Sequence, residues 1–210
     1  MHHSLRFGRS GPLGALLVMA AGCASAPQAP PQAGQARGAL PDLEGQKVMV
    51  FPVQRVRGLG SELDPAAEVA FAFEARGGAE WILPTELRRA VARTPGLTVS
   101  ADGLPVDMFL RAEVDRIGDP LFGILRRMAA LTGADLALVP VEARSAPSDA
   151  EAGQTVEIAA ALINARTGRV FWYGVVDGVS SAGSAGALAG AAEALARAVT
   201  PRLDRGREVL

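Results

Sequence analysis

The chain has 210 residues, with 21 lysines and arginines against 22 aspartates and glutamates and a formal net charge of −1. This near balance gives no general electrostatic attraction to nucleic acid, so we expect no nucleic-acid partner. The single cysteine excludes an internal disulfide, and the hydrophobic fraction of 49% is sufficient for one packed domain.

The first residues are typical of an exported protein. Two basic residues, Arg6 and Arg9, precede an apolar run from Leu13 to Ala21. This is the layout of a signal peptide, and the run is shorter than the roughly 20 apolar residues that span a bilayer. Three small residues then lead directly into Cys23, the only cysteine of the chain.

This ending resembles the lipobox of bacterial lipoproteins, with Ala20 at the position where leucine is usual. The resemblance implies cleavage between Gly22 and Cys23 and acylation of Cys23, which would attach the protein to a membrane. Ala24 follows the cysteine, where an aspartate would signal retention in the inner membrane. The resemblance therefore implies a lipid anchor in the outer membrane, facing the periplasm.

Removal of residues 1–22 would leave 188 residues, with 19 basic and 22 acidic side chains. It would also remove both histidines, His2 and His3, so the mature protein would have neither an imidazole nor a free thiol. These losses exclude Ser/His/Asp and Cys/His nucleophilic catalysis and remove the usual ligands of zinc and copper. We therefore expect no catalytic residue of these kinds, no metal and no cofactor.

Composition divides the chain into four segments. Residues 1–22 form the signal peptide, and residues 23–44 are the lipidated cysteine with a tether rich in proline, glutamine and alanine, which has little to bury. Residues 45–203 are predicted to form one periplasmic α/β domain, and residues 204–210 a C-terminal tail.

The domain begins with an alternation of strands and helices. Residues 47–53 form a nearly continuous apolar run, as expected of a strand covered on both faces. Asp64 followed by Pro65 predicts a helix start, and Gly77 lies where that helix would end. The pattern then predicts a strand at 80–83, a helix capped by Thr85 and ending near Arg93, an irregular stretch at 97–116, and a helix from Asp119-Pro120 to Leu131.

Three apolar runs follow, and they predict strands at 136–141, 156–163 and 170–176. Residues 164–168 form a hairpin loop with a late glycine, and the polar residues 144–154 a longer one. Pro140 indicates an edge strand or a bulge. With a final helix at about 185–200, we predict an α/β (α+β) fold with one mixed sheet of about five strands, helices packed on it, and the order βαβαβββα.

Acidic residues between Asp102 and Asp119 leave one route to an enzyme open. Asp102, Asp107, Asp115 and Asp119 all lie in this stretch, and a glycosidase needs only two suitably spaced carboxylates. Asp119 also suits a helix cap, with Asp115 as its charged neighbour. A hydrolase is thus an alternative that requires two of these side chains to share a cleft.

Three aromatic residues, Phe171, Trp172 and Tyr173, are consecutive on a predicted strand. Because side chains alternate along a strand, at least one must face away from its neighbours. Core packing accounts for most of this pattern. A partner-binding face that carries Trp172, or Phe171 with Tyr173, is the alternative, since aromatic residues dominate interface anchors.

Together with the lipobox, the segments 48–53, 133–139 and 164–172 resemble a group of envelope proteins. The group comprises the curli-secretion lipoprotein, the lipoprotein activators of penicillin-binding proteins, the Pel export lipoprotein and the amino-terminal domain of the Tol translocation protein TolB. The resemblance implies a non-enzymatic assembly, export or regulatory role through contacts with envelope proteins or with further copies of the chain. A lipoprotein that binds a small ligand is a further alternative.

Overall fold

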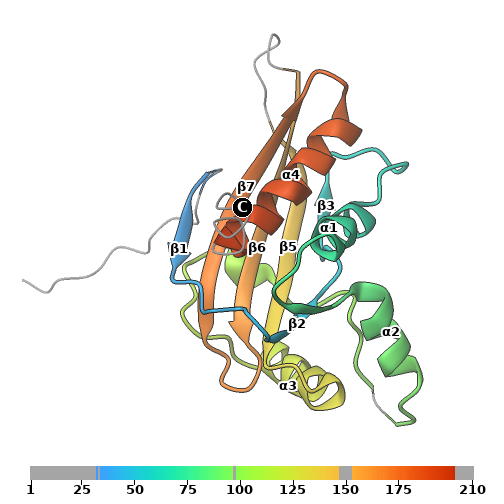
Figure 1. Cartoon of the computed structure of the whole chain (residues 1–210), viewed down its shortest axis with the longest axis vertical. Helices are drawn as coiled ribbons and strands as arrows, with labels where there is room; N and C mark the ends of the chain where they lie inside the picture. The colour runs from blue at the N-terminus through green and yellow to red at the C-terminus, as the bar shows by residue number, and fades with distance from the viewer. Residues whose placement is uncertain (1–31, 33, 97, 147–152, 202–210) are drawn as a thin grey trace, which may run out of the picture.

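The computed structural model describes residues 32, 34–96, 98–146 and 153–201 (Figure 1). These residues form one mixed sheet of seven strands in the order β1-β7-β6-β5-β2-β4, with β3 beside β5, and four α-helices. The predicted α/β class with a single mixed sheet is confirmed, with seven strands in place of about five. Cys23, the signal peptide and the C-terminal tail lie outside the described residues.

Three long antiparallel strands form the centre of the sheet: β5 (Leu136–Ala146), β6 (Gln154–Asn164) and β7 (Val170–Ser180). Their hairpin at 164–168 is confirmed, and Gly168 adopts a φ of 73° there. The predicted loop at 144–154 is wrong at both ends, because Arg144 still pairs with Glu157 in the sheet and β6 begins at Gln154. The ladder continues through polar residues because its hydrogen bonds come from the backbone.

Four shorter strands complete the sheet: β1 (Ala36–Gly38), β2 (Lys47–Val50), β3 (Val56–Arg57) and β4 (Glu80–Ile82). β2 lies parallel to β4 and β5, whereas β1 is antiparallel to β7. Both β1 and Leu43, which is 5% exposed, fall inside the range that we predicted as tether. The sheet therefore begins before residue 45.

The helices are α1 (Pro65–Glu74), α2 (Pro84–Ala92), α3 (Leu121–Thr132) and α4 (Ser184–Val199), with a 3₁₀ helix, η1 (Asp107–Leu110). α1 and α4 pack on one face of the sheet, whereas α3 and η1 belong to the core cluster of the other face (Figure 1). Both helices predicted between the strands at 80–83 and 136–141 are present, as α2 and α3, so the order βαβαβββα counts one of them too few. Within the described ranges, no helix has the length and apolar character needed to cross a membrane.

Helix ends depart from the sequence prediction at two places. The predicted cap of α1 is confirmed, because the Asp64 carboxylate accepts the backbone N–H groups of Ala66 and Ala67, both at 3.0 Å. That helix ends at Glu74, before Gly77. Thr85 does not cap α2, since the helix begins one residue earlier, and the Glu86 carboxylate accepts the N–H of Leu83 instead.

α3 begins at Leu121, and Pro120 occupies the N-cap position. The Asp119 carboxylate accepts the backbone N–H of Gly123 at 2.9 Å. Asp119 therefore satisfies a donor in the first turn, as a capping carboxylate does, although it is not the N-cap residue itself. The helix, predicted to run to Leu131, ends at Thr132, and Gly133 follows as its C-cap with a φ of 73°.

Candidate functional site

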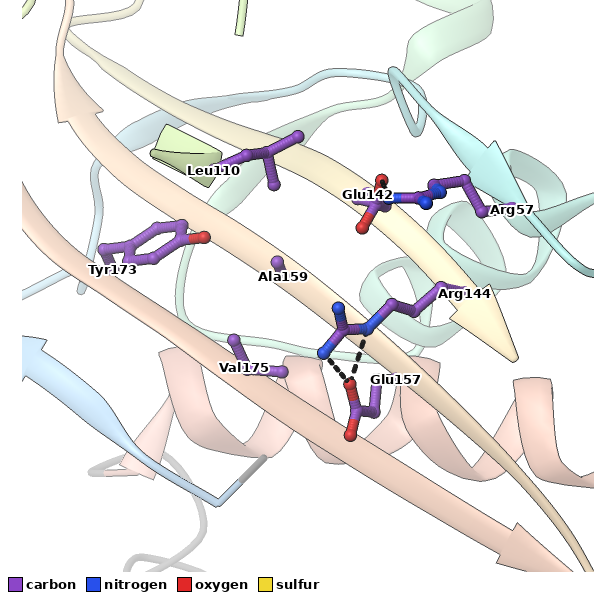
Figure 2. A pocket seen from close by; sticks show the side chains of 8 residues that line it. All are labelled: Arg57, Leu110, Glu142, Arg144, Glu157, Ala159, Tyr173 and Val175. Carbon is purple, nitrogen blue, oxygen red and sulfur yellow. Dashed lines mark hydrogen bonds and ion pairs between the residues drawn. The ribbon is translucent and has the colours of Figure 1, made fainter. Parts of the chain in front are cut away.

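A pocket of about 150 Å³ lies on the face of the sheet opposite α4, where β5, β6 and β7 meet β3 and η1 (Figure 2). Its floor is the sheet itself, and its wall includes a leucine from η1. Charged, aromatic and aliphatic side chains line it: Arg57, Leu110, Glu142, Arg144, Glu157, Ala159, Tyr173 and Val175. None of the four predicted carboxylates between Asp102 and Asp119 lines it.

A bulge in β5 places Glu142 in this pocket. The β5–β6 register pairs Pro140 with Ala160 and then Glu142 with Ala159, so Val141 is the extra residue. Because a one-residue shift exchanges the two faces of a strand, the bulge turns Glu142 away from the α4 side and toward the pocket. The bulge predicted from Pro140 is confirmed, and β5 is an interior strand instead of an edge.

The carboxylate of Glu142 is buried without a hydrogen bond. The residue is 4% exposed, and its Oε1 atom accepts no hydrogen bond from any part of the chain that the structure describes. The nearest cations are Arg57, with Nη1 at 3.7 Å, and Arg55, with Nε at 4.0 Å, both beyond hydrogen-bond distance. A buried charge that lacks donors is destabilising, so the fold retains a group that it does not satisfy.

Glu142 was not among the residues predicted from the sequence. The signal that could have found it is a single acidic residue inside the apolar run of β5, two residues after a proline that predicts a bulge. An acidic side chain in a strand covered on both faces would be strongly unfavourable. Its presence therefore indicates a place where the sheet is left open on one side.

The other arginines around the pocket have carboxylate partners. Arg144 and Glu157 are direct cross-strand neighbours, and the Nε and Nη2 atoms of Arg144 lie 2.7 and 2.5 Å from Oε2 of Glu157 (Figure 2). Arg55 donates to the carboxylate of Asp107 in η1. These pairs fix four of the charges at the pocket and its rim.

Tyr173, the only tyrosine of the chain, also faces this pocket. Its ring stacks on Phe109 of η1, with centroids 5.6 Å apart, and its hydroxyl makes no hydrogen bond within the described residues. Burial, reinforced by the negative charge of Glu142 and opposed by Arg144, raises the pKa of Tyr173 to about 12. Figure 2 shows the hydroxyl directed toward the space above Ala159.

Substitution of Glu142 by glutamine should lower the pKa of Tyr173 below its wild-type value of about 12. The tyrosinate would no longer face a carboxylate, while burial would still hold the pKa above the usual value of about 10. Because the folded-state pKa exceeds the unfolded one, both proteins should lose stability as the pH rises from about 10 through the folded pKa.

The ultraviolet absorbance of the phenolate measures this titration at one residue, with circular dichroism as a check that the protein is folded. Glu74→Gln at the last residue of α1, where the side chain is exposed, is the matched control and should leave the midpoint unchanged. Equal midpoints for wild type and Glu142→Gln would contradict the proximity of the two side chains.

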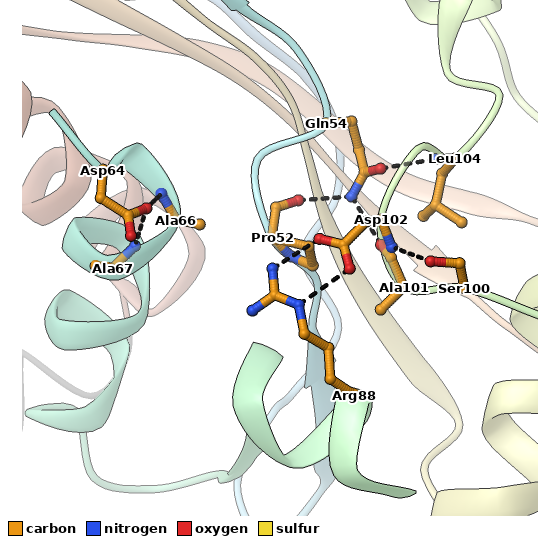
Figure 3. Close-up of polar contacts among 10 residues, drawn as sticks. All are labelled: Pro52, Gln54, Asp64, Ala66, Ala67, Arg88, Ser100, Ala101, Asp102 and Leu104. Atoms are coloured by element: carbon orange, nitrogen blue, oxygen red, sulfur yellow. Dashed lines mark hydrogen bonds and ion pairs between the residues drawn. The ribbon is translucent and has the colours of Figure 1, made fainter. Parts of the chain in front are cut away.

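The four carboxylates predicted for a hydrolase lie in separate surroundings. Asp102 forms a bidentate pair with Arg88, with hydrogen bonds of 3.0 and 2.7 Å that lower the pKa of Asp102 (Figure 3). Asp107 is bound by Arg55, whereas Asp115 and Asp119 border two different hollows. No described contact joins any two of the four, so the shared cleft that the hydrolase alternative requires is not formed by them.

The irregular segment that carries Asp102 and η1 is held against the sheet by Gln54. Its side-chain amide donates to the carbonyl oxygens of Pro52 and Ala101, at 2.7 and 3.1 Å, and its oxygen accepts the N–H of Leu104 at 2.7 Å (Figure 3). These hydrogen bonds position the segment that supplies Leu110 to the pocket.

Among the described residues, no group of three His, Cys, Asp or Glu side chains could hold a metal ion.

The aromatic run on β7 packs mainly in the core. Trp172 is 4% exposed and faces the α4 side, whereas Tyr173 is 8% exposed and faces the opposite side, as the alternation predicted. Phe171 is half-buried beneath the guanidinium of Arg169, which lies 5.5 Å from the ring centroid. The predicted partner-binding role of this run stays a prediction, and Phe171 offers the most accessible surface for it.

No protein-family model and no curated protein matches the sequence. Among solved structures, a PelC dodecamer from Paraburkholderia phytofirmans is 16% identical, with 79% of this chain and 96% of that chain covered and a TM-score of 0.43. Lipoprotein GNA1162 from Neisseria meningitidis is 17% identical (78% and 98% covered, TM-score 0.37). The LpoB C-terminal domain from Salmonella enterica is 16% identical (64% and 82% covered, TM-score 0.40).

Proteins of the predicted group are among the solved structures found. PelC is the Pel export lipoprotein, and LpoB is an activator of a penicillin-binding protein, so both belong to the group that the sequence resembles.

Proposed function

We propose that this chain is a lipoprotein anchored in the outer membrane through Cys23. On the periplasmic side it acts as a non-enzymatic assembly, export or regulatory accessory through contacts with envelope proteins. The apolar run and small residues that precede Cys23 support the anchor. The separate pairing of Asp102, Asp107 and Asp119 with other groups supports a role without hydrolysis.

The observation that carries the protein-contact function is the outer edge of β7. β1 pairs with β7 at residues 172–174, and further backbone bonds join Val175 to Gly34 and Gln35. Beyond Val175, no strand in the described part of the chain pairs with this edge. Because the N–H and C=O of Val175 point outward, those of Asp177 and Val179 point the same way.

An open strand edge can accept an additional strand from another chain. Val179 adds an apolar side chain there, with 52% of its surface exposed. Gly178 faces α4, so Val179 projects from the opposite, less covered face of the sheet. A partner strand would thus find backbone hydrogen bonds and an apolar contact together.

In-cell photocrosslinking can test this proposal in the anchored protein. A photoreactive amino acid at Val179 should give a product of discrete mass, with either another envelope protein or a second copy of the chain. The same amino acid at Phe71, which is 72% exposed on α1, is the matched control.

Asp177→Pro removes one outward N–H, and proline is tolerated on an edge strand. It should therefore remove the product from Val179. No product from Val179, or equal products from both positions, would contradict the proposal.

A further inference from the structure

Two polar groups that line the pocket, the Glu142 carboxylate and the Tyr173 hydroxyl, have no hydrogen-bond partner within the described residues. The Glu142 carboxylate is 96% buried and the Tyr173 hydroxyl lies in a residue that is 8% exposed, and neither makes a hydrogen bond within the described residues. Figure 2 shows both directed toward the space above Ala159, from strands on either side of β6. Buried polar groups in folded proteins are nearly always hydrogen-bonded, so the unsatisfied Oε1 of Glu142, with the Tyr173 hydroxyl in the same pocket, indicates a missing donor.

The charges around the pocket decide what kind of donor fits. Arg144 is held by Glu157, and Arg55 is held by Asp107. Arg57 remains as the cation nearest to Glu142. Its side chain is 67% exposed, lies 3.7 Å from the carboxylate and makes no hydrogen bond within the described residues. At this distance, and with the cation in solvent, the guanidinium is easily displaced from the carboxylate.

The remaining lining is aliphatic. Leu110, Ala159 and Val175 line the pocket beside the two polar groups. Its volume of about 150 Å³ is smaller than the roughly 300 Å³ at which pockets for drug-sized ligands begin. The site therefore suits a short apolar chain that ends in a compact cationic donor.

We propose that this pocket binds a primary alkylammonium group. The carboxylate of Glu142 accepts one or two hydrogen bonds from the ammonium N–H groups, and the hydroxyl oxygen of Tyr173 accepts another. Leu110, Ala159 and Val175 pack against the methylenes of the alkyl chain. When the ligand is absent, the guanidinium of Arg57 forms the ion pair with the Glu142 carboxylate. When the ligand binds, this guanidinium moves into solvent. The group can belong to a free amine or to a lysine side chain of a peptide. This inference does not depend on the β7 edge and goes beyond the protein-contact function.

The single tyrosine allows a site-specific test. The full chain, purified in nonionic detergent and labelled with ¹³C-tyrosine, gives one tyrosine side-chain signal from the pocket. Butylammonium should shift this signal saturably, whereas butyrate, its anionic counterpart, should not. N-acetyl-lysine amide distinguishes the two sources, because it binds comparably if the pocket accepts a lysine side chain and more weakly if it accepts only free amines.

Two variants should act in opposite directions. Glu142→Gln keeps the size of the side chain and should weaken butylammonium binding about tenfold or more, because a charged hydrogen bond is lost. Arg57→Gln removes the competing cation from an exposed position and should tighten binding about threefold. A merely structural Glu142–Arg57 pair predicts no binding in any variant.

The proposal is overturned if neither amine shifts the signal of the wild type or of Arg57→Gln. It is also overturned if butyrate acts as butylammonium does, or if Glu142→Gln binds as the wild type does. Arg57→Gln keeps the test decisive should Glu142→Gln fold poorly, because Arg57 is exposed and its replacement leaves the core intact.

Discussion

Substitution of Cys23 by serine is expected to abolish acylation of the chain and its attachment to the membrane. The acyl groups of a lipoprotein are carried by the thiol and by the amino terminus that cleavage before the cysteine creates, and a serine hydroxyl does not replace the thiol. Each buried methylene contributes about 0.8 kcal/mol to membrane binding, and one chain alone gives a binding constant of only about 10⁴ M⁻¹. Loss of two or three chains therefore removes essentially all anchoring.

Metabolic labelling with an alkyne analogue of palmitate, followed by membrane fractionation, measures this effect. The wild type should carry the label and sediment with the outer membrane, and Cys23→Ser should carry none. Ala20→Leu is the matched control, because it introduces the residue that is usual in a lipobox and should preserve or increase labelling. Label on Cys23→Ser, or an unlabelled wild type, would refute the anchor.

The central strands could be predicted from sequence in position but not in length. Apolar runs identify the part of β5–β7 that is covered on both faces, and all three strands lie where those runs are. Each strand then continues into polar residues, such as Arg144 opposite Glu157, where one face of the sheet is left open. Backbone hydrogen bonds maintain the ladder there, and they leave no hydrophobic pattern in the sequence.

β1 was missed for a related reason. Its three residues, Ala36–Gly38, bring little apolar surface, and their composition resembles the proline-rich tract that precedes them. What holds them is pairing with β7, together with an ion pair between Arg37 and Glu113 at 2.9 Å. Both partners are distant in sequence, so neither local propensity nor composition could reveal the contact.

The position of Glu142 in the pocket could be predicted only in part from the local sequence. Pro140 allowed a bulge to be predicted, because proline cannot donate to a ladder. The consequence for Glu142 depends on which face of β5 is covered by α4, and that is a property of the assembled layers. The sequence alternative of a hydrolase was placed instead on the carboxylates from Asp102 to Asp119. In the folded chain Asp102 and Asp107 bind separate arginines, and Asp119 accepts a backbone N–H in the first turn of α3.

The contact between α4 and β7 leads to the second large expected effect, which concerns stability. Gly178 faces α4, and a Cβ atom placed on it would lie 2.2 Å from both the carbonyl oxygen of Ala187 and the amide nitrogen of Ala191. These are backbone atoms of a helix, so they cannot rotate out of the way. Any side chain at residue 178 must push α4 off the sheet.

Gly178→Ala is therefore expected to lower the free energy of unfolding by about 2 to 3 kcal/mol, at the upper end of what an overpacked core costs. Displacement of α4 would also loosen the packing of Leu188 and Leu195, which are 1% and 0% exposed. Urea unfolding of the full chain, followed by circular dichroism, measures the change.

The matched control is the same substitution on the other side of this contact. A Cβ atom on Gly190, in the interior of α4, would meet only the Cα of Gly178 at 3.5 Å, an ordinary van der Waals distance. Alanine also favours a helix over glycine by about 0.5 to 1 kcal/mol. Gly190→Ala should thus stabilise the protein while Gly178→Ala destabilises it. Effects of the same sign would mean that α4 does not pack on the backbone of β7 at this point. They would then also contradict the placement of Val179 and the pocket on the opposite face of β7.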